Sequence, residues 1–185
     1  MPITTLDSRT ALVLVDLQKG IVALPTADPS TGVVARAAEL AVAFRSKGLP
    51  VVLVNVLGGA PGRTDPQAAR PAPGADWAEL VAELQAHPQD ILVSKKTWGA
   101  FTGTSLEAAL RERGVTQIVL AGISTSIGVE STARQAHELG FHVTLVVDAM
   151  TDLNEQAHAN SLARIFPRLG ETGLTKDVVA MLETR

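Results

Sequence analysis

The stretch ALVLVD, residues 11–16, decides the fold of this 185-residue chain. Five consecutive apolar residues make a run of strand length, and the run ends in a carboxylate. A strand with no polar face is buried on both sides, as in the middle of a parallel sheet that is covered by helices. We therefore expect a central strand at residues 10–15, with Asp16 at its carboxyl end.

The same pattern of a short apolar run followed by an amphipathic stretch repeats along the chain. Strands are expected at residues 10–15, 49–56, 91–95, 117–121 and 142–147, with a weak sixth strand near Glu171. Helices are expected at residues 33–47, 76–86, 104–113, 128–139 and 155–165, and from residue 176. The segment 58–74 is rich in Gly, Pro, Ala and Arg and reads as a long loop. Strands that alternate with helices predict one α/β domain over residues 1–185, with a parallel sheet and helices on both faces.

Composition argues against several classes of function. The net charge is −3 and the basic residues are scattered, which argues against binding to nucleic acid or to a membrane surface. The chain has no cysteine, so it has neither disulfides nor a thiolate nucleophile. No signal peptide or membrane span is visible, and we expect a cytoplasmic protein. Neither a metal site nor a cofactor is expected, because the four histidines are far apart and no nucleotide-binding glycine pattern follows the first strand.

Ligands of open parallel sheets bind outside the carboxyl ends of the strands. The residues to consider there are Asp16, Asn55, Lys95, Asp148 and the turn at residues 122–128. A buried Asp16 needs a cation, hydrogen bonds or a proton, although an aspartate here could also simply cap a turn. Adjacent lysines such as Lys95 and Lys96 are more often solvated charges. The turn leads into a helix and offers free backbone N–H groups to an oxygen anion, but the same pattern occurs in sheets that bind nothing.

Three segments, taken in order, resemble the isochorismatase-like hydrolase family of the cysteine hydrolase superfamily. They are ALVLVDLQ at residues 11–18, KKTWGAFTGTSL at residues 95–106 and GISTSIGVESTAR at residues 122–134; VTLVVDA at residues 143–149 continues the match. The resemblance spans nearly the whole chain. It implies a Rossmann-like three-layer α/β/α sandwich around a six-stranded parallel sheet of order 3-2-1-4-5-6. It also implies a cis peptide bond between Ile123 and Ser124.

The catalytic Asp, Lys and Cys of the resembling family fall on Asp16, Lys95 and Gly128. Without a thiolate no thioester can form, which argues against nicotinamidase or carbamoylase activity, and the metal-binding Asp-x-His motif of nicotinamidases is also missing. Isochorismatases have glycine at this position and cleave an enol ether, which needs an acid and water only. The leading hypothesis is therefore hydrolysis of a vinyl ether, with Asp16 as the acid and Lys95 orienting a substrate carboxylate. Burial of Asp16 would raise its pKa for this role, whereas the Lys95 cation would lower it.

Further residues are candidates for binding the substrate, a small carboxylated molecule. They are Gln18, Asn55, Arg63, Trp98, Phe101, Ser124 and Ile127. Arg63 and Arg70 in the long loop could clamp a carboxylate. Trp98 and Phe101 would form an apolar wall, or equally part of the core, and the amides around Ile127 and Gly128 would hold an oxygen.

Two other functions stay open at this stage. One is amide (C–N) hydrolysis with Ser124 or Ser126 as a substitute nucleophile, and the other is a non-catalytic small-molecule binder that has lost the cysteine. Thr97 and Trp98 stand where isochorismatases have Arg and Tyr, and few residues precede the first strand, so a more open pocket and a different substrate are expected. The resemblance also implies a homo-oligomer, a dimer or a tetramer.

Overall fold

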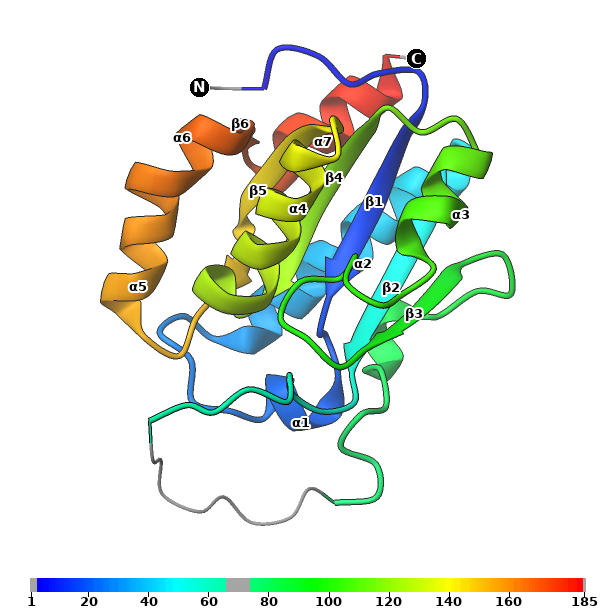
Figure 1. Ribbon diagram of the computed structural model, residues 1–185. Helices are drawn as coiled ribbons and strands as arrows, with labels where there is room; N and C mark the ends of the chain where they lie inside the picture. Colours follow the sequence, from blue (N-terminus) through cyan, green and yellow to red (C-terminus); the bar gives the residue numbers. More distant parts are fainter. Residues whose placement is uncertain (1–2, 66–73, 185) are drawn as a thin grey trace.

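The computed structural model describes residues 3–65 and 74–184, which form an α/β fold around a six-stranded parallel sheet (Figure 1). The strands are β1 (Thr10–Val15), β2 (Val51–Val56), β3 (Ile91–Lys95), β4 (Gln117–Ile123), β5 (His142–Thr151) and β6 (Glu171–Gly173). Their order in the sheet is β3-β2-β1-β4-β5-β6. This order and the fold class confirm what the resemblance implies.

Helices cover both faces of the sheet. The α-helices are α1 (Lys19–Val22), α2 (Ser30–Ser46), α3 (Leu106–Glu112), α4 (Glu130–Glu138), α5 (Glu155–Asn160), α6 (Phe166–Leu169) and α7 (Thr175–Glu183). A 3-10 turn, η1 (Ala82–Leu84), and two π-helical turns, η2 (Thr125–Val129) and η3 (Ser161–Ile165), complete the described elements. In Figure 1, α2 and α7 lie behind the sheet, whereas α3, α4 and α5 lie in front. No helix of the described ranges is both long and apolar enough to cross a bilayer.

Strand β1 explains why the sequence forms layers. Side chains of a strand alternate between its faces, so Leu12 and Leu14 pack with the core under α2 and α7. Ala11, Val13 and Val15 pack with the core under α3 and α4. Both faces are buried, which is why the run has no polar residue. Asp16 follows directly and is thereby fixed at the carboxyl edge of the central strand.

The helix expected at residues 76–86 is wrong. Only Ala82–Leu84 is helical; residues 75–78 form a turn, and residues 79–81 lie against the chain that follows β1. Their backbone hydrogen bonds go to that chain: Lys19 donates to Glu79 O at 2.8 Å, and Val81 donates to Leu17 O at 3.1 Å. These long-range bonds replace the bonds of a local helix, so the tertiary context overrides the helical pattern.

Strand β5 does not end at Asp148, as the sequence pattern suggested, but continues to Thr151. Leu120 pairs with Leu145 and Gly122 pairs with Met150, so β5 bulges between these two positions. Asp148 lies in the bulge. Its carboxylate accepts hydrogen bonds from the backbone and hydroxyl of Thr175 at 2.8 and 3.0 Å and pairs with Arg36 at 3.3 Å. Asp148 therefore anchors α7 and α2 and is not a strand-end site residue.

Candidate active site

Asp16 is buried at the carboxyl end of β1, with 5% of the residue exposed. Its backbone takes a left-handed conformation, with φ of 54°, and its N–H donates to Val54 O of the neighbouring strand at 2.9 Å. Aspartate tolerates this conformation better than most residues. Carboxylate oxygen Oδ1 is buried and has no hydrogen-bond partner among the described residues. One acceptor is thus left for a molecule that enters the site.

Lys95, at the end of β3, supplies the partner of the other oxygen. Its Nζ donates to Asp16 Oδ2 at 2.7 Å and to Thr97 O at 3.1 Å. The residue is 2% exposed, and its neighbour Lys96 is exposed. An ammonium has three N–H donors, so one of them remains beyond these two contacts. The pattern of alternation had placed Lys95 and Lys96 on opposite faces, and Lys95 is the one that reaches Asp16.

Gly128 lies in η2, the turn that links β4 to α4, and its peptide chain passes close to Asp16. A Cβ at this position would lie 3.0 Å from Asp16 Oδ2 and 3.0 Å from Val15 Cγ1. The cis peptide bond expected between Ile123 and Ser124 is present in the same turn. The structure therefore brings together Asp16, Lys95 and Gly128, the three positions that match the family's catalytic residues.

Burial and the lysine act on Asp16 in opposite directions. Burial raises the pKa of the Asp16 carboxyl from 3.8 to about 6, because its effect exceeds the lowering by the charge and hydrogen bond of Lys95. A carboxyl with this pKa is half protonated near pH 6 and carries its proton in about one molecule in ten at pH 7. It can therefore act as an acid and, after losing its proton, as a base.

The side chains of Gln18 and Asn55 form hydrogen bonds to the backbone near the carboxyl ends of β1 and β2. Gln18 is fully buried; its Nε2 donates to Val56 O at 3.2 Å and to Trp77 O at 3.1 Å, and its Oε1 accepts from Val56 N at 2.7 Å. Asn55 donates from Nδ2 to Ala78 O at 2.9 Å and accepts at Oδ1 from the Ser94 hydroxyl at 2.7 Å. Both amides thus brace the segment after residue 73 against the strand ends. Direct substrate contact by either residue stays a prediction.

The two aromatic residues expected near the substrate, Trp98 and Phe101, lie in different environments. Phe101 lies in the core, with its ring centroid 5.9 Å from that of Phe141, whereas Trp98 is 62% exposed. Trp98 is therefore the one available to a ligand. Arg63 is exposed on the segment that follows β2, and Arg70 lies outside the described residues.

The other side of the turn holds Ser124, Ser126 and Ile127. Ser124 is nearly buried, and its carbonyl accepts from the N–H of Ile127 at 3.2 Å. This bond occupies the amide of Ile127, one of the expected oxygen-binding groups. Ser126 donates from its backbone N at 2.6 Å and from its Oγ at 2.8 Å to the same oxygen, Oδ2 of Asp152.

Asp152 is a residue that the sequence reading missed. It is 2% exposed, and it also accepts from Asn154 N at 3.0 Å, so its carboxylate ties the start of η2 to the chain after β5. Like Asp16, which follows β1, Asp152 is the polar residue that directly follows a strand, so the same strand-end rule applies to it. It was overlooked because the strand was expected to end four residues earlier.

The chain thus has an α/β/α architecture with a carboxyl–ammonium pair buried at the carboxyl edge of its parallel sheet, beside a turn that opens a helix. Comparison with known proteins gives the family. The isochorismatase domain model matches residues 10–177, and the chain belongs to the isochorismatase family of hydrolases.

Three relatives illustrate the similarity. YwoC, an isochorismatase family protein of Bacillus subtilis (strain 168), is 43% identical over 183 residues, covering 95% of each chain. The structure of an isochorismatase family protein from Burkholderia thailandensis superposes with a TM-score of 0.91 at 43% identity, covering 97% of this chain and 98% of the other. Ureidoacrylate amidohydrolase RutB of Variovorax paradoxus (strain S110) is 30% identical over 186 residues, covering 84% of this chain and 74% of the relative.

Proposed function

We propose that this protein hydrolyses a vinyl ether in a small carboxylated substrate by acid catalysis, with Asp16 as the acid. The observation that carries the proposal is the buried Asp16 carboxyl, whose pKa is raised to about 6 despite its contact with Lys95. An acid works best when its pKa lies near the pH of the reaction. The absence of a side chain at Gly128 fits a reaction in which water is the nucleophile.

The reaction follows from these groups. The neutral Asp16 gives its proton to the terminal carbon of the vinyl group, and the electrons of the double bond form the new C–H bond. The carbon attached to the ether oxygen becomes an oxocarbenium ion, to which water adds. Asp16, now a carboxylate, takes up a proton from this water. The hydroxyl proton of the hemiketal then passes to the ether oxygen as the C–O bond breaks, which releases an alcohol and, from an enolpyruvyl ether, pyruvate.

Lys95 and Gly128 would bind and orient the substrate. The third N–H of Lys95 would bind the substrate carboxylate, because its other two N–H groups already bind Asp16 and Thr97. No side chain at Gly128 covers Asp16 Oδ2, to which a Cβ would come within 3.0 Å, and the Gly128 amide would hold an oxygen. Arg63 and Trp98 are the exposed groups that would contact the rest of the substrate.

The test is pyruvate release from isochorismate, followed as a function of pH. We expect kcat/KM to fall by about 10²-fold or more in Asp16→Asn, and to stay unchanged in Lys96→Met, which removes the neighbouring exposed lysine. Near-normal turnover by Asp16→Asn would show that Asp16 is not the acid. Tight binding of enol ethers and amides without turnover would favour the non-catalytic binder.

A second candidate is C–N hydrolysis with a serine nucleophile. The Ser126 hydroxyl lies 2.8 Å from Asp152 Oδ2, which could act as its base, and the relative RutB is named a ureidoacrylate amidohydrolase. A serine-reactive fluorophosphonate and intact-mass measurement would test it, with Ser126→Ala as the control. An adduct that Ser126→Ala abolishes would support this candidate, and the absence of any adduct would end it.

The remaining expectations belong to the same proposal. The chain would act as one hydrolase domain in the cytoplasm, on a small molecule and not on nucleic acid or a membrane. It would form a homo-oligomer, and light scattering of the purified protein would test this point.

A further inference from the structure

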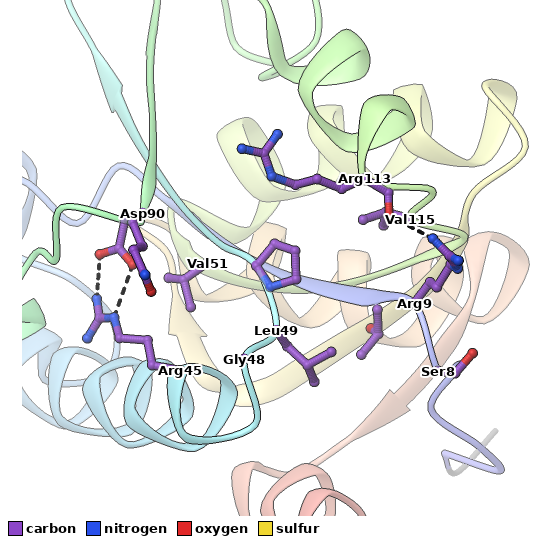
Figure 2. Close-up of a pocket in the computed structure, with 12 residues that line it drawn as sticks. Ser8, Arg9, Arg45, Gly48, Leu49, Val51, Asp90, Arg113 and Val115 are labelled. Carbon is purple, nitrogen blue, oxygen red and sulfur yellow. Dashed lines mark hydrogen bonds and ion pairs between the residues drawn. The ribbon is translucent and has the colours of Figure 1, made fainter.

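A cavity of about 410 Å³ lies at the edge of the sheet opposite to Asp16 (Figure 2). Thr10 and Val51, the first residues of β1 and β2, form part of its wall, together with Asp90 and Val115 from the chain before β3 and β4. Six residue steps of about 3.3 Å each lead from Thr10 to Asp16, so roughly 20 Å separate the cavity wall from Asp16. A ligand in this cavity would not touch the Asp16–Lys95 pair.

The cavity concentrates positive charge on a protein whose net charge is −3. Its lining contains three arginines, Arg9, Arg45 and Arg113, and one acidic residue, Asp90, which gives a net charge of +2. Arg45 and Asp90 neutralise each other through a two-pronged contact, with Nε to Oδ1 at 3.1 Å and Nη2 to Oδ2 at 2.7 Å. The positive charge that remains is that of Arg9 and Arg113.

Both of these guanidinium groups keep donors for a ligand. Arg9 donates from Nη1 to Arg113 O at 3.3 Å, and Arg113 donates from Nη1 to Ala109 O at 2.9 Å. Both acceptors are neutral carbonyls, so these contacts fix the side chains without cancelling their charge. A guanidinium has five N–H donors in a planar fork that matches carboxylate and phosphate oxygens. Figure 2 shows the Arg9 guanidinium on the side of the cavity away from the Arg45–Asp90 pair, whereas the Arg113 side chain extends from its helix toward that pair.

Part of the remaining wall is apolar, although Ser8, Thr10 and Gln89 also line it. Leu49, Pro50 and Val115 supply hydrocarbon surface. Thr10 Oγ1 is buried and has no hydrogen-bond partner among the described residues. This hydroxyl is covered by protein, so a molecule in the cavity would not reach it as the side chain stands.

We propose that this cavity is a second binding site, for a small molecule that carries at least two carboxylate or phosphate groups on a short carbon skeleton. Arg9 and Arg113 bind the anionic groups, and Leu49 and Pro50 contact the carbon skeleton. The volume lies within the range of small-molecule sites, about 300–1,000 Å³. The proposal does not depend on the reaction assigned to Asp16.

The test uses citrate and pyrophosphate as probes, titrated calorimetrically at low ionic strength because salt screens such contacts. We expect saturable binding at one site per chain and a dissociation constant at least about tenfold weaker in the double variant Arg9→Gln/Arg113→Gln. Arg164→Gln/Arg168→Gln is the matched control, because it removes the same charge from exposed positions elsewhere. Absence of saturable binding of both probes, or equal weakening in both double variants, would overturn the proposal.

A second measurement needs no variant. Backbone amide shifts of the wild-type protein should respond to citrate mainly at residues 8–10, 48–51 and 113–115, which surround the cavity. Shifts centred on Asp16, Lys95 and Gly128 would instead place the anion in the candidate active site. That outcome would overturn the second site without touching the proposed hydrolase reaction.

Discussion

Lys95 Nζ lies 2.7 Å from Asp16 Oδ2, although β2 separates the two strands that carry these residues. The two side chains are 1% and 8% exposed, so each charge is removed from water and compensated mainly by the other. Removing one partner of such a pair leaves an uncompensated buried charge. The protonation of Asp16 should therefore depend directly on the presence of the Lys95 charge.

Replacing Lys95 by Met should raise the pKa of Asp16 above its value of about 6. The substitution keeps most of the side-chain volume but removes the charge and the hydrogen bond that both lower this pKa, and burial remains. Carbon-13 NMR titration of the labelled aspartate carboxyl would measure the shift. Lys96→Met is the control and should leave the titration of Asp16 unchanged, because Lys96 is exposed. An unchanged or lower pKa in Lys95→Met would mean that the two groups do not interact in solution.

The raised pKa also predicts how stability depends on pH. Between pH 3.8 and about 6 the folded protein holds a proton on Asp16 that the unfolded chain has lost. The contribution of Asp16 to stability is therefore fully present below pH 3.8 and declines as pH rises through 6. The free energy of unfolding of the wild type, minus that of Asp16→Asn, should fall by about 3 kcal/mol across this window. Urea unfolding at several pH values would measure it; a flat difference would contradict the raised pKa.

Most of the sheet could be predicted from the sequence because burial on both faces leaves a local signature. The bounds of β1 and β3 agree with the expected residues 10–15 and 91–95. The errors lie where long-range contacts decide the local structure. The expected helix at residues 76–86 is replaced by turns and irregular chain, because part of its backbone hydrogen-bonds to the chain after β1. Strand β5 runs past Asp148 because it bulges against β4.

The candidate site was less accessible to the same reasoning. Asp16 and Lys95 are 79 residues apart, and no local pattern links them; only the family resemblance paired them. Without it, Lys95 and Lys96 read as two solvated charges. Asp152 escaped notice because its position depends on where β5 ends. Burial, which sets the pKa of Asp16, is a property of the packed molecule.

Gln18 should act as a structural brace, and its loss should destabilise the protein. Gln18→Met removes three hydrogen bonds to the backbone of Val56 and Trp77 and leaves the partly buried N–H of Val56 unpaired. We expect the free energy of unfolding to fall by about 2–4 kcal/mol. Gln156→Met, at an exposed position on α5, should change it by less than about 0.5 kcal/mol. Unchanged stability together with a raised KM would instead assign Gln18 to direct substrate contact.

Gly122 should be the least replaceable glycine of the sheet, because β4 passes closest to β1 there. Its φ is +132°, which side-chain-bearing residues rarely adopt, and a Cβ would lie only 2.1 Å from Val15 O. Gly122→Ala therefore has to push apart the two strands that carry Asp16 and η2, and we expect it to lower the free energy of unfolding by more than about 3 kcal/mol. Gly59→Ala is the matched control, because nothing lies within 4 Å of its Cβ position. Urea unfolding monitored by circular dichroism compares the two variants. Equal midpoints would mean that β1 and β4 do not approach this closely, and the placement of Gly128 beside Asp16 would lose its support.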